Sequence, residues 1–435
     1  MFILELQQNG KKMTIMNVVF DTVRKQLKRT QRLFNKQNSK KNIKTLIGDL
    51  ISVKGESAAL AISQQIIGHI DGMTQDQFEE VFTILLEFDI DTDALSNASK
   101  NYKANPSKYN FNKIKEASKP NWETAFERIN ECPGGTSCLV NLRSNLIALE
   151  KNNNNYGRLD ASLKNMLTAW FNKGFLVLEE ISWSTSAEIL EKIIEYEAVH
   201  EISSWVELKH RLEPEDRECF AYFHPAMPNE PLIFVEVALM NQVPEKIASI
   251  LSQGRVRVTK EQSDTAVFYS ISNCQVGLSG ISFGNFLIKR VASELQTKLP
   301  NLKNFVTLSP VPNFRIWLDK HHPDFAETLS NIDVHERQSL LETLNTYSAL
   351  YFVNSDRDDG LPNDAVARFH LGNGAQLISI NQFGDGSQKA WESGAGMMVN
   401  YEYILSKVEE RHEDYHRENI HSISKEIRHL AKAIN

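Results

Sequence analysis

The chain has 435 residues, 41% of them hydrophobic, and a formal net charge of -7 at pH 7. One hydrophobic core rarely serves a chain of this length, so two domains are expected. The acidic balance argues against a general nucleic-acid binder, which neutralises phosphates with clustered Lys and Arg, and four cysteines are too few for a disulfide-stabilised secreted domain.

The ends of the chain carry no targeting pattern. The first ten residues include Glu5 and lack the basic start and apolar core of a secretory signal. No apolar run approaches the length of a membrane span, and the last residues contain no peroxisomal tripeptide. The sequence therefore predicts a cytoplasmic chain without a membrane span, whose partner is a small molecule.

Residues 1–198 are predicted to form an all-α domain. Their apolar residues recur at helical spacing, and two such faces are Leu46, Leu50 and Ile51, and Phe78, Val81, Phe82, Leu85 and Leu86. Breakers at Asn105-Pro106, Pro120 and Pro133-Gly134-Gly135 separate the helices.

Residues 199–435 are predicted to form a mixed α/β domain, which makes the chain a two-domain α+β protein. Runs of strand length rich in β-branched and aromatic residues cover 232–239 and 266–272, and a third strand falls within 299–308. Asn373-Gly374 between apolar flanks predicts a hairpin, with His370 on a strand close to its turn. The charged stretch 400–435 is helical in composition.

A glycine-punctuated loop follows the strand that ends near residue 272. It comprises Gln275, Val276, Gly277, Leu278, Ser279 and Gly280, and the apolar spacing of 283–299 predicts a helix after it. Glycines allow a close backbone approach to a pyrophosphate, and a helix start adds favourable partial charge. The loop therefore indicates a nucleotide-tailed substrate, although a plain tight turn explains it equally well because it lacks both the GxGxxG and the Walker patterns.

Two further motifs compete with this interpretation. Gly280 to Gly284 matches the G-x-S-x-G pattern around Ser282, and Asp356 or Asp358 followed by His370 matches the residue order of a serine hydrolase. The elbow serine should sit directly at the end of a strand, and here 273–280 intervenes. His412 to His416 matches the H-E-x-x-H zinc pattern, but charges surround the pair, so a solvated helix face is favoured and no metal site is predicted.

Several longer motifs carry a family resemblance. They are Tyr196-Glu-Ala-Val-His200, Trp205-x-Glu-Leu-Lys-x-Arg211, Phe283-Gly-x-Phe-Leu-Ile-Lys289, Leu308-Ser-Pro-Val-Pro312, Phe369-His-Leu-x-Asn-Gly-Ala375 and Asn400-Tyr-x-Tyr403. With these motifs, most of the chain beyond the first forty or so residues resembles the malonyl-CoA decarboxylase family.

The resemblance implies a helical domain used for self-association and a catalytic domain with the N-acetyltransferase fold that binds coenzyme A without acetyl transfer. It also implies that Ser309 and His370 are catalytic and that Tyr403 belongs to the site. Some family members carry a glutamate where this chain has Ser282, so no family role is transferred to that position.

The chemistry is compatible with this assignment. Loss of carbon dioxide from a malonyl thioester leaves an enolate, so the site must stabilise negative charge on oxygen and deliver a proton to carbon. The thioester itself delocalises the electrons, so no cofactor is expected. We expect Ser309 and His370 to act on the malonyl group, and 275–280 with Ser282 to hold the coenzyme A tail. Two other functions stay open: an acyl-CoA thioesterase or serine hydrolase acting through Ser282, and a non-catalytic malonyl-CoA sensor.

Overall fold

The computed structural model describes residues 41–150, 154–281, 287–354 and 357–432. The chain divides into two compact units, one of residues 1–170 with 275–281 and the other of 171–274 with 282–435. The domain boundary predicted from composition falls at residue 198. The elements β1 and α10 precede that residue but belong to the second unit.

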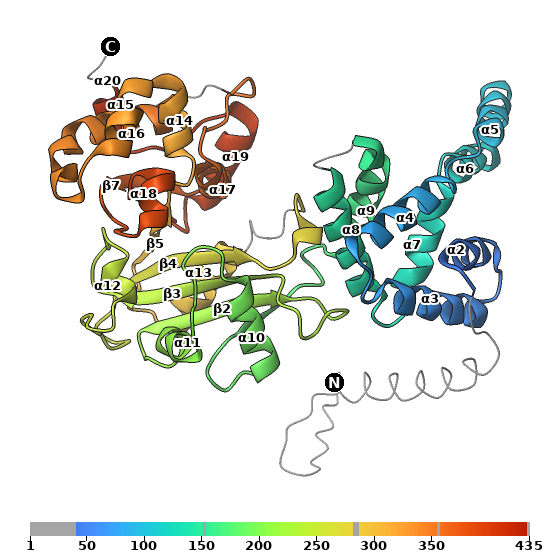
Figure 1. The fold of residues 1–435 in the computed structure, drawn as a ribbon, viewed down its shortest axis with the longest axis horizontal. Coiled ribbons are helices and arrows are strands. Elements are labelled where there is room, and N and C mark those ends of the chain that lie inside the picture. Colours follow the sequence, from blue (N-terminus) through green and yellow to red (C-terminus); the bar gives the residue numbers. More distant parts are fainter. Residues whose placement is uncertain (1–40, 151–153, 282–286, 355–356, 433–435) are drawn as a thin grey trace, which may run out of the picture. The chain divides into compact units, whose positions relative to one another are not determined.

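The described part of the first unit is helical (Figure 1). Its elements are α2 (Ile43–Ser52), α3 (Glu56–Ile70), α4 (Gln75–Leu86), α5 (Thr92–Ala104), α6 (Lys108–Ala117), α7 (Asn121–Asn130), α8 (Gly135–Glu150), η1 (Asn154–Tyr156), α9 (Gly157–Trp170) and η2 (Val276–Leu278). The predicted apolar faces are confirmed, since Leu46 and Leu50 of α2 and Phe82 and Leu85 of α4 are buried in one core. Asn42, whose side chain accepts from the N–H of Thr45, caps α2.

The second unit is built on an eight-stranded sheet. Its strands are β1 (Val177–Glu180), β2 (Arg217–Phe223), β3 (Ile233–Met240), β4 (Thr265–Asn273), β5 (Asn304–Thr307), β6 (Ser309–Pro310), β7 (Gln376–Asn381) and β8 (Met398–Glu402). The order is β1-β2-β3-β4-β5-β8-β6, with β7 paired to β8, and every pair is antiparallel except β4 with β5. The three strands predicted within 232–308 are confirmed as β3, β4 and β5.

Helices surround this sheet (Figure 1). They are α10 (Ala187–Tyr196), α11 (Trp205–Leu212), α12 (Ala248–Leu251), α13 (Leu287–Lys298), α14 (Phe314–His321), α15 (Pro323–Asn331), η4 (Val334–Leu340), α16 (Leu341–Val353), α17 (Ala365–Gly372), α18 (Gln388–Gly394), α19 (Val408–Glu418) and α20 (Lys425–Lys432). The crossover from β4 to β5 contains α13, as a parallel pair requires. A helical unit followed by a mixed α/β unit is the predicted fold class.

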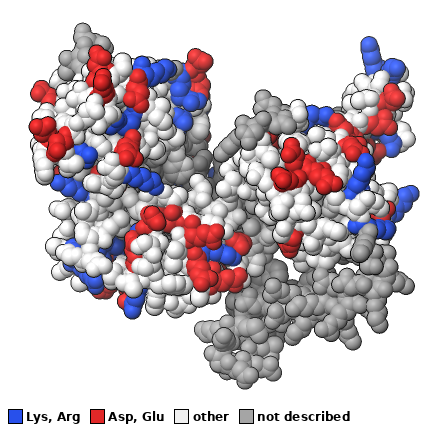
Figure 2. Space-filling view, in the orientation of Figure 1, with Lys and Arg blue, Asp and Glu red and all other residues white. Residues whose placement is uncertain are grey.

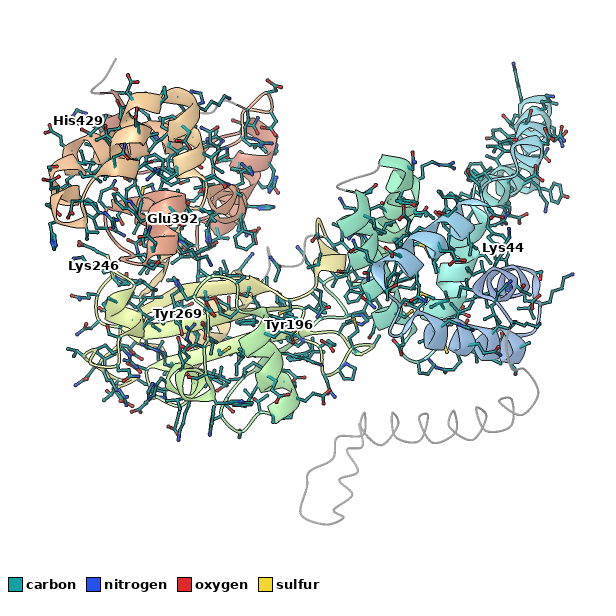
Figure 3. The ribbon with its side chains drawn as sticks, in the orientation of Figure 1. Lys44, Tyr196, Lys246, Tyr269, Glu392 and His429 are labelled. Atoms are coloured by element: carbon teal, nitrogen blue, oxygen red, sulfur yellow. The ribbon has the colours of Figure 1, made fainter. Side chains whose placement is uncertain are left out.

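The sheet opens between β4 and the strands that follow it. The parallel pairing of β4 with β5 ends at Phe268 and Thr307, and the next residues join β6, which pairs with β8 instead. Among the described residues, the remainder of β4 therefore has no strand partner on that side. Tyr269, labelled in Figure 3, is the extra residue of a β-bulge in β4 opposite β3, and such bulges bend a strand and re-aim its side chains.

Charged side chains of both signs are scattered over the visible face of the described residues, and the larger clusters there are acidic (Figure 2), in keeping with the net charge of -7. Among the described residues, no helix is long and apolar enough to cross a membrane.

Candidate active site

Ser309 lies on β6, at the point where the sheet opens. Its backbone pairs with Val399 of β8, and its side chain is buried. The hydroxyl donates to Oγ1 of Thr307 at 2.9 Å and lies 3.2 Å from Nε2 of His370. The two groups that the sequence analysis selected, 61 residues apart in the chain, are therefore in hydrogen-bond contact.

His370 reaches this position from the last turn of α17, so the predicted hairpin around Asn373-Gly374 is wrong. The side chain of Asp364 accepts from the N–H of Ala367 and starts the helix, while Gly374, at φ 81°, ends it. The N–H of Ala375 returns to the carbonyl of His370, which is the bonding of a helix C-terminus. Asn-Gly favours positive φ both in a hairpin turn and at the end of a helix. The two structures differ in whether the preceding segment pairs with another strand or forms a helix.

Two tyrosines from β8 and its end enclose the imidazole. The hydroxyl of Tyr403 lies 2.8 Å from Nδ1 of His370. The ring of Tyr401 stacks on the imidazole, with centroids 4.5 Å apart and an interplanar angle of 23°. Both nitrogens of His370 therefore have a polar neighbour, and one face of its ring is covered.

Burial sets the electrostatics of the site. It lowers the pKa of His370 to about 3 and raises the pKa of Tyr403, because both charged forms lose solvation in an apolar interior. The imidazole and the phenol are therefore neutral at pH 7. A charged histidine, the usual general acid near neutral pH, is not present in this site.

Thr307 and Asn400 also belong to the site, although no role was predicted for either of them from the sequence. Oγ1 of Thr307 accepts from Ser309 and from the N–H of Tyr401, the latter at 3.2 Å. Nδ2 of Asn400 donates to the carbonyl of Thr307 at 2.8 Å and ties β8 to β5. Thr307 stands two residues before Ser309 on an extended segment, and alternation along a strand puts such pairs on one face, which is the signal that could have found it.

A cavity of about 260 Å³ opens beside Ser309 and His370. Most of its walls are apolar, with Phe268 and Ile271 from β4 on one side and Val366 and Phe369 from α17 on the other. Such a pocket suits a ligand that is largely desolvated when bound. Its position follows from the missing strand partner of β4.

The glycine loop belongs by its contacts to the first unit. Arg143 of α8 donates to the carbonyls of Gly277 and Ser279 at 2.7 and 2.9 Å, and Asp160 of α9 orients its guanidinium. A Cβ at Gly277 would lie 1.9 Å from the carbonyl oxygen of Val140. Close packing against α8 thus explains this glycine without a phosphate.

The turn itself also has a structural basis. The N–H groups of Leu278 and Ser279 bond to carbonyls within the turn, and Gly280 has a φ of 75°, a conformation that side chains disfavour. Ser282, which the sequence analysis placed next to this loop, lies outside the described residues.

The H-E-x-x-H pair on α19 has a structural setting. Nδ1 of His412 and Nε2 of His416 lie 2.6 and 3.2 Å from the carbonyl oxygen of Gly372. The pair therefore holds α19 against the end of α17, the helix that carries His370. In the described ranges, no group of three or more His, Cys, Asp or Glu side chains is placed to bind a metal.

Comparison with known proteins identifies the family. The model of the malonyl-CoA decarboxylase C-terminal domain matches residues 174–435, and that of the N-terminal domain matches 88–171. The chain belongs to the malonyl-CoA decarboxylase family. The C-terminal match includes Ser309, His370 and Tyr403 and spans nearly all of the sheet-containing unit, together with the segment 275–281 that belongs to the helical unit.

Individual relatives agree with this membership. The mitochondrial malonyl-CoA decarboxylase of Anser anser anser is 35% identical over 325 residues, which are 66% of this chain and 64% of that protein. The mitochondrial enzyme of Rattus norvegicus is 34% identical over 334 residues, 68% of each chain. These matched stretches span about two thirds of the length of the curated relatives.

Solved structures extend the likeness to the fold. The malonyl-CoA decarboxylase of Agrobacterium vitis is 39% identical with a TM-score of 0.85, and it covers 90% of this chain and 100% of its own. The Rhodopseudomonas palustris protein is 37% identical with a TM-score of 0.82, over 89% and 98%. Members of the family thus share both units of the chain.

Proposed function

We propose that this chain is a malonyl-CoA decarboxylase, a carboxy-lyase that converts malonyl-CoA to acetyl-CoA and carbon dioxide. The observation that carries the proposal is the hydrogen-bonded series Thr307, Ser309, His370 and Tyr403 beside an apolar cavity, in a chain whose family bears that name. Malonyl-CoA is accordingly the proposed substrate.

We infer one direction for the protons of the series. Because His370 is neutral, one ring nitrogen carries a hydrogen and the other accepts. If the hydroxyl of Tyr403 donates to Nδ1, then Nε2–H donates to Ser309, whose own hydrogen goes to Thr307. The opposite tautomer leaves the Tyr403 hydrogen buried with no acceptor, which costs about 1–3 kcal/mol, so the Nε2–H form is favoured.

This arrangement suits decarboxylation at neutral pH. The bond between the α-carbon and the carboxylate breaks, carbon dioxide leaves, and the electron pair moves into the thioester as an enolate. The hydroxyl of Ser309, turned from Thr307 to the substrate, donates to the developing negative charge. It then gives its proton to the α-carbon, Nε2–H of His370 stabilises the serine oxygen that is left, and one proton taken up from solvent restores the hydroxyl.

The neutral walls serve the same step. An apolar environment destabilises the localised charge of the malonyl carboxylate more than the delocalised charge of the enolate that forms from it. Phe268, Ile271 and Val366 supply that environment. Tyr403 holds the imidazole through Nδ1 and does not itself ionise, because burial raises its pKa.

We also propose that the coenzyme A tail uses residues 275–280 together with Ser282. Support comes from the glycine loop directly after β4 and from the helix α13 that follows it. Binding energy from the tail would orient the malonyl group at Ser309. Replacing Ser279 by Glu should raise KM for malonyl-CoA and leave kcat within about twofold. An unchanged KM would show that this loop does not bind the coenzyme A tail.

The decisive experiment follows both products of malonyl-CoA with the purified chain, acetyl-CoA by chromatography and carbon dioxide by a coupled assay. Ser309→Ala and His370→Asn should each lower kcat at least about a hundredfold, whereas the exposed Ser339→Ala serves as a control and should retain full activity. Full activity of either site variant would refute the proposed pair.

The same experiment separates the two other functions. Free coenzyme A without carbon dioxide, abolished by Ser282→Ala, would identify a thioesterase. Stoichiometric binding of malonyl-CoA in calorimetry with no product of either kind would identify a sensor. Methylmalonyl-CoA, followed through propionyl-CoA, tests whether the cavity admits an additional methyl group.

We further propose that the helical unit mediates self-association into a homo-oligomer. Helix α6 buries none of its side chains within the chain and leaves Tyr109 70% exposed and Phe111 45% exposed, and exposed aromatic residues are enriched at interfaces. Tyr109→Glu with Phe111→Glu should reduce the mass measured by light scattering. An unchanged mass would exclude this helix as the interface.

A cytoplasmic location is proposed on the state of the thiols. All four cysteines are buried and free, as expected in a reducing compartment. The Anser anser anser and Rattus norvegicus relatives are named mitochondrial, so fractionation of the native cells is the test, and recovery with the mitochondria would refute the proposal.

A further inference from the structure

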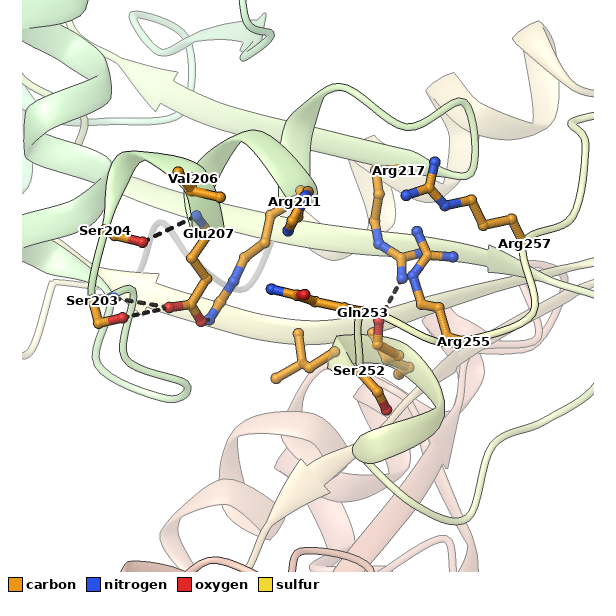
Figure 4. Close-up of a pocket in the computed structure, with 13 residues that line it drawn as sticks. Ser203, Ser204, Val206, Glu207, Arg211, Arg217, Ser252, Gln253, Arg255 and Arg257 are labelled. Carbon is orange, nitrogen blue, oxygen red and sulfur yellow. Dashed lines mark hydrogen bonds and ion pairs between the residues drawn. The ribbon is translucent and has the colours of Figure 1, made fainter.

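A second cavity in the sheet-containing unit is lined by arginines (Figure 4). It has a volume of about 440 Å³ and lies between α11, the start of β2 and the segment 250–257 around and after α12. Four guanidinium groups line it, those of Arg211, Arg217, Arg255 and Arg257. It shares no lining residue with the cavity beside Ser309.

Two of the arginines are neutralised by carboxylates. Arg211 lies 3.0 Å from Oε2 of Glu236 and 2.8 Å from Oε1 of Glu207. Arg255 binds both carboxylate oxygens of Asp216, one of them at 2.8 Å. Ion pairs of this kind stabilise the walls of the cavity, and by themselves they require no ligand.

The other two arginines are not neutralised in this way. Arg217 donates to the carbonyls of Asp216 and Ile250 at 2.9 and 2.6 Å, and its closest carboxylate oxygen, on Asp216, is 3.6 Å away and already bound by Arg255. Arg257 has no hydrogen bond or ion pair within the part of the chain that the structure describes, and Figure 4 shows it beside Arg217 and Arg255.

The charges therefore do not balance. Four guanidinium groups face three carboxylates, Glu207, Glu236 and Asp216, which leaves at least one positive charge in excess. Burial, and then the neighbouring Arg255, lower the pKa of Arg217. An anion placed among these groups would offset both effects, because opposite charge stabilises the ionised form.

We propose that this cavity binds a compact polyanion whose carboxylate or phosphate oxygens are held by Arg217, Arg255 and Arg257. Guanidinium groups present a planar fork of donors that matches both kinds of oxygen and makes two parallel hydrogen bonds to either. The hydroxyl of Ser252 and the amide of Gln253 line the same space and supply further donors.

The lining also limits the size and type of the ligand. The imidazole of His210 lines this cavity, but among the described residues no Phe, Tyr or Trp side chain does, so a nucleotide base would lack a large aromatic face on which to stack. The apolar part of the wall is small and aliphatic, from Val206, Ile250 and Leu251. A compact organic acid or a small phosphate compound therefore fits better than a nucleotide.

The test is isothermal titration calorimetry of the full chain with inorganic pyrophosphate and, separately, citrate. Saturating coenzyme A is present throughout, so the substrate site cannot account for the heat. We expect one site per chain for at least one of the two probes, with affinity that falls as salt is raised, since the interaction is ionic. The probe that binds distinguishes a phosphate ligand from a carboxylate ligand.

Two variants locate the site. Arg257→Gln removes an exposed guanidinium and should weaken binding about tenfold or more, the usual scale for a charged hydrogen bond. Arg417→Gln removes the same charge from the exposed face of α19 and should leave affinity within about twofold. Absence of binding of both probes at millimolar concentration, or equal weakening by both variants, would overturn the proposal.

Discussion

The neutral, buried His370 makes a prediction that does not depend on catalysis. In the folded chain its pKa is about 3, against an ordinary value of 6.5. Between these two values the unfolded chain binds the proton and the folded chain does not, so acidification favours unfolding. The stability that this histidine confers is present above about pH 6.5 and is lost as the pH falls toward 3.

The size of the effect follows from the difference in pKa. Each unit of pH below 6.5 costs about 1.36 kcal/mol for one such group. Between pH 7 and pH 5 the wild-type chain should therefore lose about 2 kcal/mol of unfolding free energy through His370 alone. His370→Asn removes the titrating group, so this variant should lose about 2 kcal/mol less than the wild type over the same interval.

Urea unfolding at pH 7, 6 and 5, followed by tryptophan fluorescence, measures the difference. Trp317 and Trp391 report on the unit that contains the site. His200, a half-buried histidine with a pKa lowered by desolvation to about 4, remains in both proteins and cancels from the comparison. His335→Gln on the surface controls for the loss of a histidine as such. Equal acid sensitivity of wild type and His370→Asn would refute the neutral, buried imidazole.

Three further predictions test the surroundings of Ser309 and His370 and the packing of the glycine loop. Thr307→Val should lower kcat about tenfold and Thr307→Ser should restore it, because only the hydroxyl holds Ser309; equal rates in both variants would exclude that role. Tyr403→Phe removes the partner of Nδ1 and should lower kcat at least about tenfold. Tyr401→Phe, which loses a buried hydroxyl that has no hydrogen-bond partner among the described residues, should keep full activity and gain about 1 kcal/mol in urea unfolding. Gly277→Ala places a Cβ against the carbonyl of Val140 and should destabilise the helical unit by about 2 kcal/mol or more, measured by thermal unfolding; a neutral result would mean that the turn shifts freely.

Local patterns in the sequence were sufficient to predict several of the strands and helices. Runs of strand length rich in β-branched and aromatic residues predicted β3 and β4, which are buried along almost their whole length. Helical spacing predicted the buried faces of α2 and α4, because burial on one side of a helix imposes that period directly. Ser309 and His370 were selected from family motifs. Their selection required no knowledge of the distance between them.

The hairpin around Asn373 shows where local patterns fail. Positive φ at Gly374 is needed both in a hairpin turn and after a helix. The cap by Asp364 and the packing of α19 on the end of α17 decide for the helix, and these contacts join residues up to 44 positions apart. The glycine loop is similar, since the packing of Gly277 against α8 is not visible in its own sequence.

The sequence by itself determined which residues could do the chemistry and which segments could form strands or helices, because side-chain type and periodicity are local properties. Only the tertiary structure decided that Ser309 meets a neutral His370, since burial of that imidazole depends on α17, β8 and the opening of the sheet together. The arginine cavity likewise exists only in the folded chain, where four guanidinium groups from three separate segments come to share one space with too few carboxylates to neutralise them.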